Sequence, residues 1–178
     1  MKKLLSILLV LTMVCSFSIG FAEDKEKTTV FYDDGLSFAM ALPEGYTLAS
    51  TVDDGALLAA ITSERPQDPS FLMVVAPENE YDGIQRLNDL SDEGIEQFAL
   101  GMMEDLTNPY YEVRETGLGS KLIVLNEQNS EFDVVILASI YQGYLLYLYV
   151  EHADGAEVTQ KDIDMGIQIY TDMDFITK

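Results

Sequence analysis

The chain of 178 residues contains no tryptophan, a single cysteine (Cys15) and a single histidine (His152). A lone cysteine forms no disulfide within the chain, and a lone histidine excludes a multi-histidine metal site. Tryptophan is a common platform for sugar rings, so its absence argues against a carbohydrate-active enzyme. Only 10 residues are lysine or arginine against 31 aspartate and glutamate residues, a formal charge of −21. This charge repels nucleic acids and anionic membranes, so neither is an expected partner.

The first 22 residues have the layout of a secretory signal peptide, and we expect cleavage near Ala22. A basic head (1–3) and an apolar stretch (4–19) are followed by small residues at Gly20 and Ala22 and then by an abrupt acidic run. This order of segments is typical of an export signal. The lysine-rich head is typical of bacteria, so we expect a bacterial protein that is secreted or stays at the cell surface.

Two alternatives to cleavage are weaker. A retained membrane anchor needs about 20 apolar residues to cross the bilayer, and the run from Leu4 to Ile19 is shorter. A lipoprotein would carry its lipid on Cys15, but Met13 and Val14 depart from the small residues expected before a lipidated cysteine. Without the signal, eight basic residues face all 31 acidic ones, and the formal charge becomes −23. Residues 23–178 then form one cysteine-free domain with no stable membrane insertion.

Most of this domain has the pattern of short strands joined by tight turns. Asp53-Asp54-Gly55 and Gln142-Gly143 are typical hairpin turns, because glycine adopts positive φ without strain. Neighbouring strands joined in this way are antiparallel. The predicted strands are residues 28–32, 36–42, 46–50, 56–63, 71–76, 110–116, 121–127, 132–141, 144–152 and 174–176.

The hydrophobic period changes to that of a helix in two places. Ser91 is the expected N-cap of the first helix, which Asn108-Pro109 ends. Its apolar stripe contains Ile95, Phe98, Ala99, Met102, Met103 and Leu106. Thr159 caps the second helix, with Asp162 as its capping-box partner. The apolar face of this helix contains Ile163, Gly166, Ile167 and Tyr170, and Gly166 permits a close approach to the sheet. We therefore predict an α+β fold, a mainly antiparallel β-sheet with two amphipathic helices packed on it and an N-terminal β-hairpin.

Two segments carry a resemblance to a known family. Residues 35–46 read Gly-Leu-Ser-Phe-Ala-Met-Ala-Leu-Pro-Glu-Gly-Tyr, and residues 163–176 combine a helix with an apolar strand. With these features the chain resembles the Mog1/PsbP-like family over most of residues 28–176. The resemblance implies a central antiparallel sheet with helices on its faces. It also implies a non-catalytic role, because members are mostly accessory photosystem subunits, partners of small GTPases or secreted domains of unknown role.

The expected function is therefore a secreted, non-catalytic binding or accessory domain whose partner is an unknown protein or a component of the cell envelope. No cofactor is expected. One alternative is a small secreted hydrolase with paired carboxylates or a Ser/His site. However, the chain lacks Gly-x-Ser-x-Gly and Walker patterns, and no catalytic residue is assigned. His152 is expected to be a solvated side chain at the end of a strand.

A weak calcium-binding surface is a further alternative. The acidic pairs are Asp33-Asp34, Asp53-Asp54, Glu104-Asp105, Asp162-Asp164 and Asp172-Asp174. Calcium prefers several carboxylate oxygens from one loop, but no stretch has the spacing Asp-x-Asp-x-Asp-Gly. The first two pairs fit hairpin turns better, and no metal site is assigned.

Tyrosines are concentrated in the predicted hairpin 132–152. Strand alternation places Leu145, Tyr147 and Tyr149 on one face, and it places Tyr144, Leu146, Leu148 and Val150 on the other. The second set is expected in the core. The first set is either covered by a helix, which we favour, or exposed as an aromatic patch. Tyr141, Tyr147 and Tyr149 are the candidate partner surface.

Overall fold

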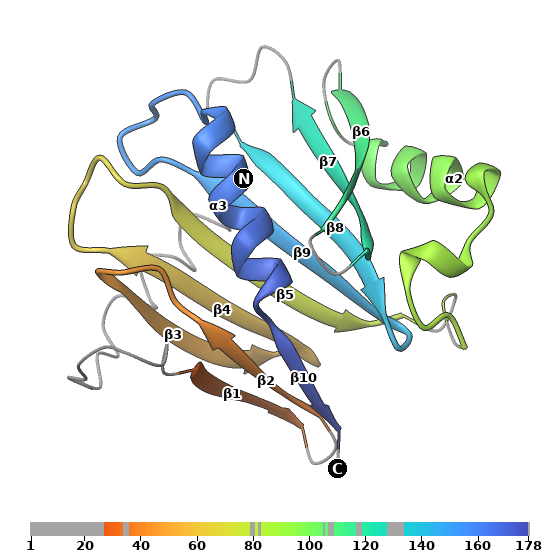
Figure 1. Ribbon diagram of the computed structural model, residues 1–178, viewed down its shortest axis with the longest axis horizontal. Coiled ribbons are helices and arrows are strands. Elements are labelled where there is room, and N and C mark those ends of the chain that lie inside the picture. The colour runs from red at the N-terminus through yellow and green to blue at the C-terminus, as the bar shows by residue number, and fades with distance from the viewer. Residues whose placement is uncertain are drawn as a thin grey trace.

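The computed structural model describes residues 27–33, 36–78, 81, 83–104, 106, 109–116, 119–127 and 134–177. The predicted signal peptide with Cys15 lies outside these residues, as do Asp34, Gly35 and Asp105. Within the described residues, ten strands form two sheets and two α-helices pack on them (Figure 1). The predicted α+β class is confirmed.

Seven strands form the larger sheet, in the order β3-β4-β5-β9-β8-β7-β6, and every neighbouring pair is antiparallel. The strands are β3 (Tyr46–Asp53), β4 (Ala56–Ser63), β5 (Ser70–Pro77), β6 (Pro109–Glu115), β7 (Lys121–Glu127), β8 (Val135–Tyr141) and β9 (Tyr144–Glu151). Strands β5 and β9 are neighbours although a helix and three strands separate them in the sequence. Their pairing joins two meanders of hairpins into one sheet.

Local turn chemistry explains the hairpins. Asp54 and Gly55 have φ values of 47° and 79°, and Gln142 and Gly143 have φ values of 49° and 80°. Two consecutive positive φ values suit a two-residue turn whose twist matches that of the strands. The hairpins β3–β4 and β8–β9 therefore form where the sequence predicts them.

The smaller sheet joins the two ends of the described chain. Its order is β1 (Lys27–Asp33), β2 (Leu36–Ala41) and β10 (Asp174–Thr177), so the last strand pairs with the N-terminal hairpin. Phe38 and Met40 from β2 are fully buried and share a core with one face of the larger sheet. The predicted N-terminal hairpin is confirmed, and its partner strand follows directly from helix α3 (Figure 1).

The two helices pack on opposite faces of the larger sheet. Helix α3 (Gln160–Thr171) contacts β8 and β9 on the face that carries the smaller sheet. Helix α2 (Asp92–Met103) and the 3₁₀ turn η2 (Leu87–Asp89) cover the other face near β6–β8, where Ile95 and Phe98 are buried. Helix α2 ends before the predicted position, because the chain turns at residue 106 to enter β6 and the amide of Leu106 donates to the Met103 carbonyl.

Gly166 allows α3 to lie directly against the sheet. A Cβ atom at this position would stand 2.8 Å from Cδ1 of Leu137 and 3.4 Å from Cγ2 of Val150. Leu137 is fully buried, so its side chain has little room to move away. The predicted close approach at Gly166 is confirmed.

Replacement of Gly166 with valine is therefore expected to destabilise the protein by about 2 kcal/mol, because overpacking in a dense core typically costs 1–3 kcal/mol. Chemical denaturation measures this change. Gly101→Val on α2 is the matched control, since nothing lies within 4 Å of a Cβ atom there. The control should be neutral or slightly stabilising because valine has the higher helix propensity. Equal effects at the two sites would contradict the close packing of α3.

Candidate functional site

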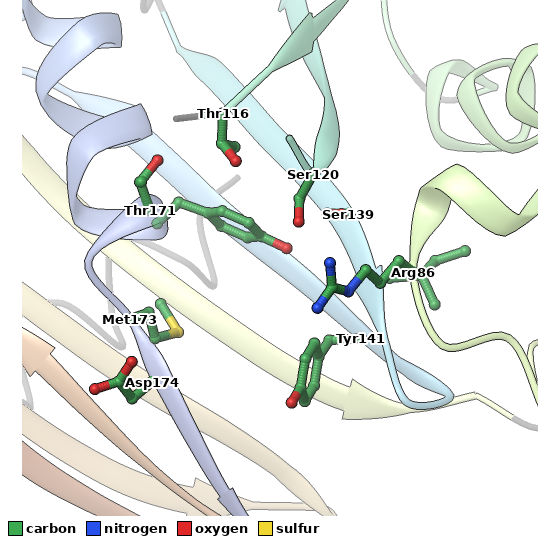
Figure 2. A pocket seen from close by; sticks show the side chains of 10 residues that line it. Arg86, Thr116, Ser120, Ser139, Tyr141, Thr171, Met173 and Asp174 are labelled. Carbon is green, nitrogen blue, oxygen red and sulfur yellow. The ribbon is translucent and has the colours of Figure 1, made fainter. Parts of the chain in front are cut away.

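A cavity of about 500 Å³ lies at the C-terminal end of α3, between β8, the start of β10 and the segment that leads into η2 (Figure 2). We call it the Arg86 pocket. Its lining residues are Arg86, Thr116, Ser120, Ser139, Ile140, Tyr141, Tyr170, Thr171, Met173 and Asp174. Hydroxyl groups dominate this lining, with one cation and one carboxylate among them. The volume is in the range of small-molecule sites, roughly 300–1,000 Å³.

Arg86 stands on a segment that is fixed against the tip of the β8–β9 hairpin. Arg86 forms an antiparallel bridge with Tyr141, and the amides of residues 142–143 donate to the carbonyls of residues 84–85 at 3.0 Å. The backbone amide of Arg86 donates to Oδ2 of Asp89 at 3.0 Å. These bonds hold the Arg86 backbone in place, so that its guanidinium extends into the pocket beside Tyr141 (Figure 2).

Tyr170 and Ser139 form the deepest polar part of the pocket. Ser139 is buried, and its hydroxyl donates to the carbonyl of Lys121 at 3.0 Å. The Tyr170 hydroxyl is hydrogen-bonded to Ser139. Burial raises the pKa of Tyr170 to about 12, although the Ser139 hydrogen bond and the charge of Arg86 act in the opposite direction. Tyr170 is therefore a neutral hydroxyl throughout the physiological pH range.

The charges of the pocket are unequally compensated. Asp174 forms an ion pair with Lys27 across the smaller sheet. Arg86 has no carboxylate partner among the residues that the structure describes. Among the described residues, the uncompensated charge of the pocket is therefore positive, although the chain as a whole is strongly acidic.

The prediction of a solvated His152 is wrong. Its side chain is only 8% exposed, and Nε2 lies 3.1 Å from Oδ2 of Asp162. The same carboxylate oxygen accepts hydrogen bonds from the backbone amide and the hydroxyl of Thr159, at 2.8 and 2.6 Å. The predicted capping box at the start of α3 is thus confirmed, and it has an additional member. A charged, buried carboxylate needs several donors, and His152 supplies one of them.

This cluster does not have the geometry of a catalytic triad. A triad requires the hydroxyl to hydrogen-bond to the histidine, which removes its proton. Here the Thr159 hydroxyl donates to Asp162, and His152 approaches the same oxygen. The arrangement holds the N-terminus of α3 against the end of β9. Its role is therefore structural.

The three candidate tyrosines do not share one surface. Tyr141 pairs with Tyr144 on the α3 face of the sheet and lines the Arg86 pocket. Tyr147 and Tyr149 lie on the opposite face, with ring centroids 6.4 Å apart. Tyr147 packs at the edge of the core beneath α2, against a cluster that contains the buried Leu145. Burial raises the pKa of Tyr147 to about 12 and also raises that of Tyr149.

A second cavity, of about 440 Å³, lies between the start of α2 and the β6–β7 edge, and its acidic lining residues are Asp92, Glu93 and Glu96. All three are exposed, and Lys121 lies 4.0 Å from Asp92. In the described part of the chain no group of three or more histidine, cysteine or acidic side chains is arranged to hold a metal ion. Asp53 and Asp54 occupy the β3–β4 turn, as the sequence predicts.

Sequence reasoning did not identify the polar residues of the Arg86 pocket. Tyr170 was predicted on the apolar face of the last helix, and Arg86 lies in a segment with no clear period. One signal was present, because Ser139 interrupts the apolar run Val135–Ile140 at a position that faces the core. A buried hydroxyl at such a position needs a partner. Ser139 therefore marks the place where the sheet contacts polar groups of other elements.

Comparison of the chain with known protein families and with curated proteins found no match. Among the described residues, no helix is long and apolar enough to cross a membrane. The description of the site therefore depends on its geometry alone.

Proposed function

We propose that the protein is an exported, non-catalytic binding domain of Mog1/PsbP-like architecture that holds a small ligand in the Arg86 pocket. The predicted export signal supports this location, with the mature protein secreted or held at the cell surface. Three features of the fold support the family. They are the N-terminal hairpin, the antiparallel sheet with helices on both faces, and the C-terminal helix that leads into a short strand.

The observation that carries this proposal is the composition of the pocket lining. It combines an uncompensated guanidinium with hydroxyl groups of serine, threonine and tyrosine, which are suited to orient a ligand. Its one carboxylate, Asp174, is engaged with Lys27, and His152 is engaged with Asp162 elsewhere. No lining residue is arranged as a nucleophile with an adjacent base. This composition favours binding over the alternative of a hydrolase.

A blocked pocket tests the proposal. Ser120 lines the pocket from the β6–β7 connection and points into it (Figure 2), so Ser120→Phe is expected to fill the space. The probes are benzoate, benzamide and benzylamine, which are similar in size but anionic, neutral and cationic. We expect saturation-transfer NMR to detect at least one probe bound to the unmodified protein and none bound to Ser120→Phe.

Ser50→Phe is the matched control, because Ser50 is exposed on β3 and does not line the pocket. The control should bind the probe as the unmodified protein does, and thermal melting should show that both variants are folded. The proposal is wrong if none of the three probes binds, or if the blocked variant binds as well as the control.

A further inference from the structure

We infer that the Arg86 pocket selects the carboxylate group of a singly charged organic anion. This inference rests on the proposed binding function and assigns its chemical class of ligand. The argument begins with the pairing of the arginines. Arg65 pairs with Asp68 at 2.9 Å, and Arg114 approaches Asp164 at 3.5 Å and also pairs with Glu112. Arg86 alone of the arginines lacks such a partner in the described part of the chain.

The isolation of Arg86 is unusual because the chain has 31 acidic residues and only 10 basic ones. Among the described residues, the charged groups of the pocket are Arg86 itself and Asp174, and Lys27 neutralises Asp174. The pocket is therefore a local positive site that a carboxylate from outside the chain can complete.

The donors around this site fit a carboxylate. A guanidinium presents a planar fork of N–H donors that matches the two oxygens of a carboxylate. Ser120 directs its hydroxyl toward the guanidinium of Arg86 (Figure 2). Ser139 donates its one proton to the Lys121 carbonyl and is bonded to Tyr170, so these two hydroxyls line the deep side, and the donors that face the ligand are those of Arg86 and Ser120. Ile140, Met173 and the ring of Tyr141 offer apolar surface to the organic part of the ligand.

The field of the whole protein favours a single negative charge over several. A formal charge of −21 repels any approaching anion, and this repulsion grows in proportion to the charge of the anion. One guanidinium compensates one unit of ligand charge. Inorganic phosphate carries more charge than this at neutral pH and offers no apolar part. It is therefore expected to bind more weakly than a monocarboxylate.

The experiment is an isothermal titration of the protein with benzoate, benzamide and inorganic phosphate. A second arm uses a short neutral peptide with a free C-terminal carboxylate and the same peptide with an amidated C-terminus. We expect a carboxylate probe to bind and its amide counterpart to bind at least tenfold more weakly. Binding of benzoate identifies a free acid as the source of the carboxylate. Tighter binding of the free peptide than of benzoate identifies a chain terminus.

Two substitutions of Arg86 and one control substitution of Arg114 locate the interaction. Arg86→Gln is expected to weaken carboxylate binding by about 10- to 100-fold, in line with the loss of hydrogen bonds from a charged donor. Arg114→Gln is the control at a paired arginine and should leave binding unchanged. Arg86→Lys keeps the charge without the fork and should give an intermediate affinity. Binding should also be constant from about pH 6 to 9, because Arg86 stays charged.

Three results would each overturn the inference. They are equal binding of benzoate and benzamide, tighter binding of phosphate than of benzoate, and undiminished carboxylate binding by Arg86→Gln. In each of these cases a probe still occupies the pocket or its surroundings, so the blocked variant Ser120→Phe separately decides the proposed function. If benzamide binds and Ser120→Phe abolishes that binding, the binding function holds and the carboxylate assignment fails. If Ser120→Phe has no effect on any probe, both fail.

Discussion

Replacement of Phe38 with alanine is expected to lower the free energy of unfolding by about 4 kcal/mol, because removal of a buried phenylalanine side chain typically costs 3–5 kcal/mol. Phe38 lies on β2 with 0% of its surface exposed. Its strand neighbours in the smaller sheet are Val30 and Phe175, and its side chain belongs to the core shared with the larger sheet. The cavity left behind would therefore weaken the contact between the two sheets. The melting temperature should fall by roughly 8–16 °C.

The matched control is Tyr110→Ala on β6, where the aromatic side chain is 45% exposed. We expect it to cost less than about 1 kcal/mol. Urea denaturation followed by circular dichroism measures both variants. A change of less than 1 kcal/mol in Phe38→Ala would mean that the smaller sheet does not share a core with the larger one. Unfolding of Phe38→Ala in two separate steps would lead to the same conclusion.

Local chemistry explains how much of the fold could be predicted. The turns at Asp54-Gly55 and Gln142-Gly143 require residues that accept positive φ, and these residues stand in the sequence between two predicted strands. The caps Ser91 and Thr159 mark the helix starts in the same way. These signals are local, so they are visible without knowledge of the tertiary structure. They determine the elements and the antiparallel character of the hairpins.

The pairings between distant strands could not be predicted in this way. Strand β9 pairs with β5, and β10 pairs with β2, across long stretches of sequence. Such pairings depend on which apolar faces remain to be covered after the hairpins form. Several strand orders bury similar apolar surface, and no turn residue distinguishes them. The closure of the smaller sheet by β10 was therefore visible only in the structure.

The Arg86 pocket could not be predicted from the sequence for the same reason. Arg86, Ser139 and Tyr170 come from three elements that meet only because α3 crosses the sheet beside β8. Each residue is ordinary in its own segment, since a lone arginine in a loop and a tyrosine on a helix carry no motif. His152 was misread for a related reason. The sequence identifies Asp162 as the capping-box partner of Thr159. It does not show that the end of β9 brings a third donor to the same oxygen.

Replacement of Asp162 with alanine is expected to cost about 3 kcal/mol at pH 7. Loss of the capping-box hydrogen bonds from Thr159 accounts for about 1 kcal/mol, and the buried donor of His152 left without an acceptor accounts for roughly 1–3 kcal/mol. Asp162 is 7% exposed, and its Oδ2 accepts from His152 and from both donors of Thr159. Urea denaturation at pH 7 measures the cost.

The pH dependence gives this prediction a second readout. Burial alone would raise the pKa of Asp162, but the hydrogen bonds from Thr159 and His152 outweigh burial and hold the pKa below its ordinary value of 3.8. A carboxyl group with a lowered pKa stabilises the fold above the pKa of the unfolded state, and this contribution is lost as the pH falls through the folded pKa. The difference between the unmodified protein and Asp162→Ala should therefore be complete at pH 7 and should shrink as the pH falls below 3.8.

Asp164→Ala is the control on the same helix, because Asp164 is exposed and its contacts with Gln160 and Arg114 lie at the surface. It should cost less than about 1 kcal/mol. A cost below 1 kcal/mol for Asp162→Ala would show that His152 and Thr159 find other partners or water. A cost that is the same at pH 7 and pH 3 would show that the charge of Asp162 makes no contribution. Either result would contradict the structural role of the His152–Asp162–Thr159 cluster at the start of α3.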